Sequence, residues 1–298
     1  MYIPTSNLQD VEVLSTRSNL IGSTMVPGEI KEIARYGGKG IRGGIVQGDA
    51  LDFLRTIKAG SASLVFLDPP FNLGKLYTAL NVSLDQKPEQ DYRLWMEDIL
   101  VESTRILEDG GTLYLYHIPV WAMRFGTFLE SRLHFKQWIA ISMKNGFMRG
   151  RRLYPAHYAL LMFTKGRPNH FTRPRIEPKR CRHCKEYIKD YGGYTHIIEK
   201  QGINLSDFWE DLSPVRHSNR KNRSANELPP LLFSRIFDIS GGNPGYYVDP
   251  FAGAGSGVLQ AAKLGLKFSA CDIVRTNCDI IKRRLDQLKS LKKGKPYD

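Results

Sequence analysis

The chain has 298 residues, 42% of them hydrophobic and 24% charged, which excludes wholesale disorder, collagen-like repeats and a long coiled coil. No run approaches the ~20 apolar residues of a membrane span, and residues 1–28 lack the basic-then-apolar layout of a secretory signal, so we expect a cytoplasmic protein. With 43 Lys and Arg against 30 Asp and Glu, the net charge of +13 favours a polyanionic partner over an acidic metabolite.

Residues 1–44 are predicted to form an irregular N-terminal arm, because glycines cluster at its end. Regular structure is expected to begin with a short strand at 45–49 that ends in Asp49. An amphipathic helical turn follows. The continuous apolar run at 63–67 is then typical of a parallel strand buried on both faces.

Strands and helices alternate through most of the remaining chain. Apolar spacing predicts helices at 92–107, 120–133, 230–239, after Gly257 and at 277–291, and strands at 112–118, 136–143, 158–164, 246–248 and 267–270. This alternation predicts an α/β fold with a doubly wound sheet in one domain, 45–298. Such sheets bind their ligands at the carboxyl ends of the strands.

The regular pattern stops between 165 and 226, where Arg, Pro, Gly, His and Tyr dominate, as in a loop-rich binding insert. Residues 144–225 hold 18 Lys and Arg against 7 Asp and Glu. A merely solvated surface would spread this excess along the chain, so we expect the segment to bind nucleic acid. The side chains expected to contact DNA are Arg149, Arg151, Arg152, Arg173, Arg175, Arg180 and Arg182. The alternative face is the last helix, with Lys282, Arg283 and Arg284.

A glycine-rich turn follows the strand at 246–248 and reads Asp249-Pro250-Phe251-Ala252-Gly253-Ala254-Gly255. Glycines let backbone N–H groups approach a bound ligand closely. The signal alone is weak, since Gly253-x-Gly255 with Asp272 at the next strand end also fits a dinucleotide site, where the acid binds ribose hydroxyls. A turn that binds nothing is the other alternative.

The strand at 63–67 runs into Asp68-Pro69-Pro70-Phe71. The two prolines fix φ and supply no N–H, so the Pro69 carbonyl can point outward. This carbonyl and the Asp68 carboxylate form adjacent acceptors, which suit the two donors of an exocyclic NH₂ group. Phe71 offers a stacking face for a flat base. A plain Pro-Pro turn is the alternative.

Together, the two motifs and the basic insert resemble the amino-type S-adenosylmethionine-dependent DNA methyltransferases, which modify N6 of adenine or N4 of cytosine. The motif at Asp68 precedes the motif at Asp249, which is similar to the permuted β-class order. In that order the target-recognition region lies between the catalytic and cofactor motifs. The resemblance extends from Ile45 to the last helix.

The resemblance implies a Rossmann-like methyltransferase fold with a mixed, mostly parallel sheet, and S-adenosyl-L-methionine as cofactor. Cofactor contacts are expected from Asp49, Asp249, Phe251, Gly253, Ala254, Gly255 and Asp272. Catalytic contacts are expected from Asp68, Pro69, Pro70 and Phe71. The Asp-Pro-Pro-Phe spelling resembles adenine-N6 enzymes, so the expected reaction is site-specific methylation of a flipped-out adenine in double-stranded DNA. A homodimer and a cognate restriction endonuclease are left open as further partners.

Three alternatives remain. An N4-cytosine methyltransferase acting on DNA or RNA shares all the motifs. An NAD-dependent enzyme would explain the glycine-rich turn but neither the Asp68 motif nor the basic insert. A non-catalytic DNA-binding protein would keep the charge, but we expect it to have lost Asp68 or the glycines, and both are present.

The pair Cys181-x-x-Cys184 lies in the basic insert, beside His183 and upstream of His196. A structural zinc ion needs four ligands, and the chain has one such pair. We therefore favour unligated thiols in a local turn and predict no metal.

Overall fold

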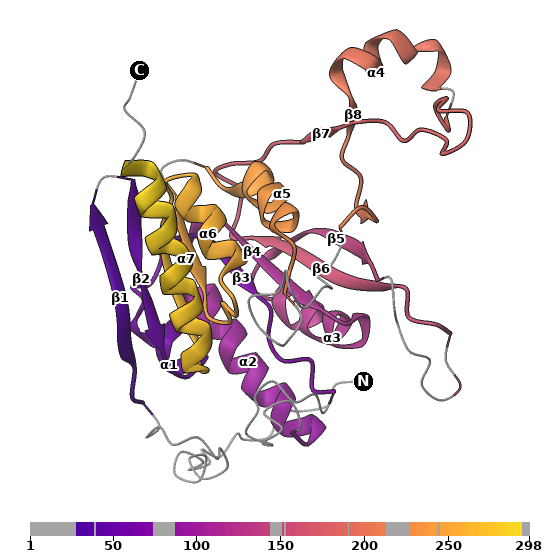
Figure 1. Ribbon diagram of the computed structural model, residues 1–298. Helices are drawn as coiled ribbons and strands as arrows, with labels where there is room; N and C mark the ends of the chain where they lie inside the picture. The colour runs from indigo at the N-terminus through magenta and orange to yellow at the C-terminus, as the bar shows by residue number, and fades with distance from the viewer. Residues whose placement is uncertain are drawn as a thin grey trace, which may run out of the picture.

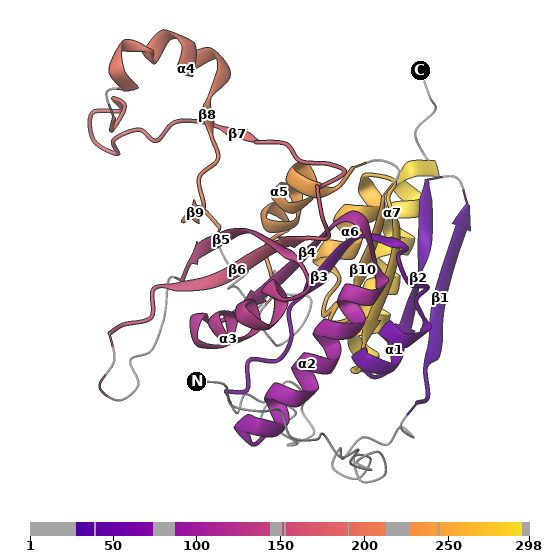
Figure 2. The same cartoon turned by 180° about the vertical axis from the view of Figure 1, so that it is seen from behind.

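The computed structural model describes residues 28–293 except 39, 74–86, 144–150, 152, 190, 213–226 and 243–244. Within these ranges a nine-stranded sheet has the order β1-β2-β11-β10-β3-β4-β6-β5-β9 (Figures 1 and 2). Its strands are β1 (Lys31–Gly38), β2 (Ile41–Gln47), β3 (Ala62–Leu67), β4 (Leu107–His117), β5 (His134–Ser142), β6 (His157–Thr164), β9 (Phe208–Trp209), β10 (Tyr246–Asp249) and β11 (Lys267–Asp272).

The centre of the sheet, from β2 through β11, β10 and β3 to β4, is parallel. Strands β1 and β6 pair antiparallel with their neighbours. The predicted mixed, mostly parallel sheet is therefore confirmed. Because β3 and β10 are adjacent, the two motifs that are far apart in sequence follow neighbouring strands.

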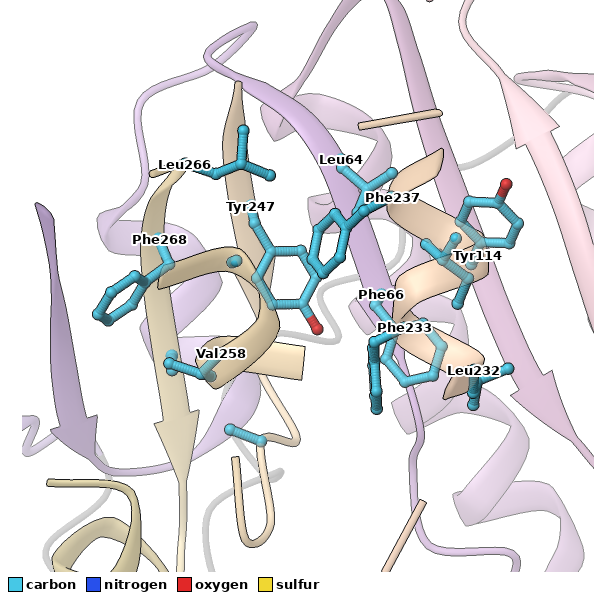
Figure 3. Close-up of a cluster of buried hydrophobic side chains, with 14 of the residues drawn as sticks. Leu64, Phe66, Tyr114, Leu232, Phe233, Phe237, Tyr247, Val258, Leu266 and Phe268 are labelled. Carbon is cyan, nitrogen blue, oxygen red and sulfur yellow. The ribbon is translucent and has the colours of Figure 1, made fainter. Parts of the chain in front are cut away.

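Helices cover both faces of the sheet. Apolar side chains of α1 (Ala50–Thr56), α2 (Glu89–Ile106) and α3 (Pro119–Glu130) pack on one face. Helices α5 (Pro230–Ser240), α6 (Ser256–Lys263) and α7 (Arg275–Lys293) pack on the other. Figure 3 shows this second core, where Phe66 of β3 meets Phe233 of α5 with ring centroids 4.9 Å apart. The double winding is thus confirmed. None of the described helices is long and apolar enough to cross a membrane.

The N-terminal prediction is wrong for residues 31–44. Strands β1 and β2 form an antiparallel hairpin whose last pair is Gly38 with Ile41, and β2 pairs with β11 in the main sheet. Two of the glycines that suggested a loop have structural roles in these strands. Gly40 has φ of 101° in the hairpin turn, and Gly43 allows β2 to pair closely with β11, since a Cβ there would lie 2.6 Å from the Phe268 ring. Residues 1–27 lie outside the described residues.

The insert at 165–226 leaves the sheet at the edge opposite the carboxyl ends of the parallel strands. Thr164, the last residue of β6, pairs with Thr112, five residues before the carboxyl end of β4. The Thr172 N–H donates to the Ile239 carbonyl near the end of α5 (3.0 Å). Residues 173–206, which we call the arm, then project away from the sheet (Figures 1 and 2). The arm contains β7 (Arg175–Ile176), α4 (Thr195–Gln201) and β8 (Ile203–Asn204).

Candidate active site

Four aspartates lie at the carboxyl ends of adjacent parallel strands. Asp49 and Asp68 lie just beyond β2 and β3, and Asp249 and Asp272 end β10 and β11. Parallel strand ends meet at one edge of a sheet, where ligands bind in folds of this type. The structure therefore gathers the acidic residues of both predicted motifs at a single edge.

One pocket is shared by the two motifs. Asp68 lines it from the end of β3, and the glycine-rich turn lines it from the end of β10. Within the described residues, the lining consists of Phe66, Asp68, Glu227, Leu228, Phe233, Asp249, Phe251, Ala252, Ala254 and Ser256. Of the predicted residues, Asp68, Asp249, Phe251 and Ala254 therefore meet at one hollow.

The glycine-rich turn is shaped by left-handed glycines and held by two carboxylates. Gly253 and Gly255 have φ of 53° and 79°, a region that side chains with a Cβ rarely adopt. The Phe251 N–H donates to Asp249 Oδ1 (3.1 Å), and the Gly253 N–H donates to Asp272 Oδ2 (2.8 Å). A Cβ on Gly255 would lie 2.7 Å from Ile281 of α7, so the helix packs directly on the turn.

Asp49 and Asp272, predicted as cofactor residues, also have structural roles. Asp49 caps α1, since its Oδ1 accepts hydrogen bonds from the N–H groups of Leu51 and Asp52 (2.8 and 3.3 Å). Asp272 Oδ1 accepts from the Val274 N–H and the Asn277 amide (2.8 and 3.0 Å). Contacts of these two carboxylates with a cofactor stay predictions.

Asp249 is a buried acid with a perturbed pKa. Burial, with smaller contributions from Asp68 and Asp272, raises the pKa of the Asp249 carboxyl to about 7. Hydrogen bonds donated by the Tyr247 hydroxyl (2.8 Å) and the Phe251 N–H oppose this rise. Gathered acids of this kind favour a cation in the site, because a positive charge relieves their mutual repulsion.

The Asp68 motif lies against a group of aromatic rings. Asp68 is half-buried, and Phe71 is 8% exposed. The Phe71 ring packs beside His117, Tyr158 and Tyr116, with centroids 4.8, 5.8 and 6.0 Å away. In this conformation Phe71 contacts protein rings, and its stacking on a target base stays a prediction.

Tyr158 is a site residue that the sequence analysis missed. It lies on β6, is half-buried, and stands close enough to Asp68 that this acid adds to burial in raising the pKa of the Tyr158 hydroxyl. Its position in an apolar strand indicated a core residue. Only the pairing of β6 beside β4 brings it to the Asp68 edge.

Glu227 and Arg284 were also missed. The Glu227 carboxylate is 5% exposed, lines the pocket, and accepts hydrogen bonds from Ser256 Oγ and Arg284 Nη1 (3.2 Å each). Arg284 also donates to the Ala254 carbonyl (2.5 Å). On the alternative DNA face named for the last helix, Arg284 is therefore committed to the pocket: its side chain is 19% exposed, and it falls three residues after buried Ile281 of α7.

The predicted DNA-binding arginines fall into two groups. Arg151 is exposed in the connection between β5 and β6, the connection that leads to Tyr158 and the Asp68 edge. Arg173, Arg175, Arg180 and Arg182 are exposed on the arm, which leaves from the opposite edge. Arg149 and Arg152 lie outside the described residues.

Two of the arm's arginines bind the arm itself. Arg175 Nη2 donates to the Gly202 carbonyl (3.0 Å), and Arg180 Nη2 donates to the Tyr187 hydroxyl (2.6 Å). Arg173 lies over the Phe171 ring, 5.5 Å from its centroid. Phosphate contacts by these side chains stay predictions.

The cysteine pair lies at the surface of the arm. Cys181 is half-buried and Cys184 exposed, both as free thiols. The Cys181 N–H donates to the Glu186 carbonyl (2.7 Å), which closes a tight turn. Within the described residues, His, Cys, Asp and Glu side chains form no group of three that could hold a metal ion.

Comparisons with known proteins agree with this geometry. A family model described as DNA methylase, of the N6/N4 type, matches residues 62–283. The type II methyltransferase M.BamHI of Bacillus amyloliquefaciens is 38% identical over 86% of this chain, which spans 60% of the length of M.BamHI. The DNA adenine methyltransferase YhdJ of Escherichia coli strain K12 is 28% identical over 81% of this chain and 82% of its own.

Solved structures share the fold. The cytosine-N4-specific PvuII DNA methyltransferase superposes with a TM-score of 0.58 at 13% identity, covering 84% of this chain and 91% of its own. A Thermus thermophilus protein complexed with S-adenosyl-L-methionine gives 0.53 at 18% identity, covering 81% and 93%. The sheet is thus the Rossmann-like sheet of DNA methyltransferases. With the family model spanning both motifs and the pocket between them, this chain belongs to the N6/N4 DNA methylase family.

Proposed function

We propose that this protein transfers the methyl group of S-adenosyl-L-methionine to the exocyclic amine of a base in double-stranded DNA. The observation that carries this proposal is the single pocket shared by Asp68 and the glycine-rich turn. A group-transfer enzyme needs its acceptor and its donor side by side. The end of β3 offers acceptors for an amine, and the end of β10 offers a backbone cradle.

The charge of the pocket supports a cationic cofactor. Its ionisable lining within the described residues consists of Asp68, Glu227 and Asp249. S-adenosyl-L-methionine carries a positive sulfonium, which nearby carboxylates attract, whereas the pyrophosphate of NAD would be repelled. Arg284, a described cation next to the pocket, is paired with Glu227. The acidic lining therefore favours S-adenosyl-L-methionine over a dinucleotide.

The chain's own contribution to the reaction is positioning and electrostatics. When bound, S-adenosyl-L-methionine supplies an electrophilic methyl group. The exocyclic nitrogen is a poor nucleophile because its lone pair is delocalised into the ring. Asp68 and the Pro69 carbonyl would accept hydrogen bonds from its two N–H groups and favour a pyramidal nitrogen whose lone pair faces the methyl group. As the nitrogen gains the methyl group, it would lose one proton, and the sulfur electron pair would leave with S-adenosylhomocysteine.

The target amine is hidden within duplex DNA, so the base must leave the stack at a cost of a few kcal/mol. The ring group around Phe71 and Tyr158 lies next to Asp68 and would pack against the extruded base. The basic insert at 165–226 would act as the target-recognition region. The relatives named as type II methyltransferases support a site-specific enzyme with a cognate endonuclease.

Adenine N6 is the proposed acceptor. The Asp-Pro-Pro-Phe spelling supports it, as does the similarity to YhdJ, a protein named as an adenine methyltransferase. Cytosine N4 presents the same two donors and is the second candidate, since the acceptor pair at Asp68 suits either base.

The test is product identification. The purified chain is incubated with deuterated-methyl S-adenosyl-L-methionine and unmethylated genomic DNA, and the nucleosides are analysed by mass spectrometry. Labelled N6-methyladenine is the expected product. Labelled N4-methylcytosine would replace adenine by cytosine in the proposal, and DNA without label at saturating enzyme would refute methyl transfer.

A further inference from the structure

Two buried polar residues lie directly behind the Asp68 motif. Tyr92 of α2 is 2% exposed and His117, at the end of β4, is fully buried. The Tyr92 hydroxyl contacts the Pro70 carbonyl at 2.5 Å and His117 Nε2 at 2.7 Å. His117 Nδ1 in turn lies 2.8 Å from the Ile118 nitrogen. Three hydrogen bonds thus connect the backbone after β4 to the second proline of the motif.

The direction of each hydrogen bond in this chain follows from its two ends. A peptide N–H can only donate, so the Ile118 N–H makes His117 Nδ1 an acceptor. A neutral imidazole then carries its proton on Nε2 and donates to the Tyr92 oxygen. The Tyr92 hydroxyl proton is left to donate to the Pro70 carbonyl, which can only accept.

His117 is held in the neutral form that this arrangement needs. Burial lowers the pKa of His117 to about 3. A second proton on Nδ1 would also face the Ile118 N–H, donor against donor. The same side chain that directs Tyr92 also lies against Phe71, with ring centroids 4.8 Å apart and planes inclined by 31°.

The residue that follows the motif is fastened as well. Asn72 has φ of 56°, and its side chain accepts a hydrogen bond from the Lys87 N–H (2.7 Å) and donates one to the Lys87 carbonyl (2.9 Å). The motif is therefore fixed at Pro70, at the Phe71 ring and at Asn72. Pro70 and Phe71 both depend on His117.

We propose that Tyr92 and His117 are positioning residues that fix the backbone of Asp68-Pro69-Pro70-Phe71, and thereby aim the Asp68 carboxylate and the Pro69 carbonyl at the target amine. This role rests on the proposed methyl transfer for its catalytic consequence, and on the hydrogen-bond chain alone for its structural one. Removing the Tyr92 hydroxyl frees the Pro70 carbonyl and leaves a buried His117 N–H unpaired. Small displacements of reacting groups cost up to about 100-fold in rate.

The variant that tests this is Tyr92→Phe, which keeps the ring packing against Trp121 (4.8 Å). Its matched control is Tyr114→Phe. Tyr114 is fully buried on β4, on the other face of the sheet. In the part of the chain that the structure describes, its hydroxyl hydrogen-bonds only to Ser240 Oγ (2.9 Å). Both variants lose one buried hydroxyl, but only Tyr92→Phe loses a hydrogen bond to the Asp68-Pro69-Pro70-Phe71 backbone. His117→Gln and His117→Leu form a second pair, because Gln can still donate to Tyr92.

Hydrogen exchange and kinetics are measured on the same preparations. In Tyr92→Phe the amides of Phe71 and Asn72 should exchange faster than in Tyr114→Phe. The kcat for methyl transfer should fall about 10- to 100-fold, with the KM values for cofactor and DNA unchanged. His117→Gln should retain more kcat than His117→Leu at equal thermal stability.

The exchange measurement decides the structural role whether or not methyl transfer is observed. Equal exchange rates of the Phe71 and Asn72 amides in Tyr92→Phe and Tyr114→Phe would overturn the inference. So would a fall in kcat that is the same in both. If Tyr92→Phe does not fold, equal kcat in His117→Gln and His117→Leu would overturn it. A wild-type protein that transfers no methyl group would instead refute the proposed function, while faster exchange in Tyr92→Phe would still support the hydrogen-bond chain.

Discussion

The carboxyl-end site and the arm differ in what holds them in place. At the site, Asp249 and Asp272 are 2% and 8% exposed, and their carboxylates accept hydrogen bonds from backbone N–H groups of the glycine-rich turn and of Val274, just before α7. On the arm, α4 buries no residue completely, and Arg175 and Arg180 bind the arm's own polar groups. A region with few buried contacts opens at low cost. Substitutions at the site should therefore have large, local effects, and substitutions on the arm small ones.

Asp68→Ala should have the largest effect. Without the carboxylate, the target amine loses one acceptor, and we expect methyl transfer to fall by about 100-fold or more, the loss seen when one electrostatic contact to the reacting group is removed. S-adenosyl-L-methionine binding, measured by calorimetry, should weaken far less than methyl transfer, because the carboxylates of Glu227 and Asp249 still line the pocket. Asp109→Ala, whose side chain is 97% exposed near the start of β4, is the control and should remain active. Full methylation by Asp68→Ala would exclude Asp68 from the reaction.

Gly255→Ala should have the next largest effect, on cofactor binding. An alanine at 255 would have to keep the left-handed φ of the glycine, which costs about 1–2 kcal/mol of stability. Its Cβ would also lie 2.7 Å from Ile281. Gly265→Ala is a matched control, because Gly265 has φ of 74° but nothing within 4 Å of an added Cβ. Both variants should lose some stability in thermal denaturation. Only Gly255→Ala should weaken cofactor binding; equal affinities would separate the turn from the cofactor.

Asp249→Asn should change the pH dependence of cofactor binding more than it changes the affinity itself. A bound cation stabilises the ionised carboxylate, so cofactor binding to wild type should release a proton and strengthen as pH rises through about 7. Calorimetry in buffers of different ionisation enthalpy measures this release. Asp249→Asn should abolish it, and a wild type that releases no proton would contradict a cation beside Asp249.

The Asp249 carboxyl also makes folding stability depend on pH, in the direction opposite to cofactor binding: stability falls as pH rises. The pKa of Asp249 is raised from about 3.9 in an unfolded chain to about 7 when folded. Its favourable contribution is therefore complete below the unfolded value and is lost as pH rises through about 7. The free energy of unfolding of the unliganded protein should decline less across this interval in Asp249→Asn.

The arm should give the smallest effect. Each phosphate contact contributes about −0.9 to the slope of the logarithm of the DNA-binding constant against the logarithm of the salt concentration. The double variant Arg173→Ala, Arg182→Ala should therefore have a shallower slope on long duplex DNA, by the contribution of about two contacts. Because the arm leaves from the edge opposite Asp68, kcat at saturating DNA should not change, and the difference in slope should vanish as the duplex is shortened. Arg151→Ala should affect short duplexes too, and an unchanged slope on long DNA would make the arm a merely solvated surface.

Features of the site whose residues are consecutive in the chain could be predicted from the sequence. Asp68-Pro69-Pro70-Phe71 and the turn after Asp249 each lie in one run, and their convergence follows from a parallel sheet. Tyr92, His117, Tyr158, Glu227 and Arg284 come from separate elements, and their apolar surroundings or helical charge gave no sign of the site. The hairpin of β1 and β2 was missed because its glycines indicate a loop as readily as a close strand contact. The edge from which the arm leaves depends on the antiparallel pairing of β6 with β4, which local patterns do not determine.

The central claim is that both motifs form one acidic site for a cationic methyl donor. Calorimetric titration of the wild-type chain with S-adenosyl-L-methionine, and separately with NAD, tests it most directly. We expect saturable binding of S-adenosyl-L-methionine, which weakens in Gly255→Ala but not in Gly265→Ala, and no binding of NAD at the same concentrations. Tight binding of NAD with none of S-adenosyl-L-methionine would contradict the account.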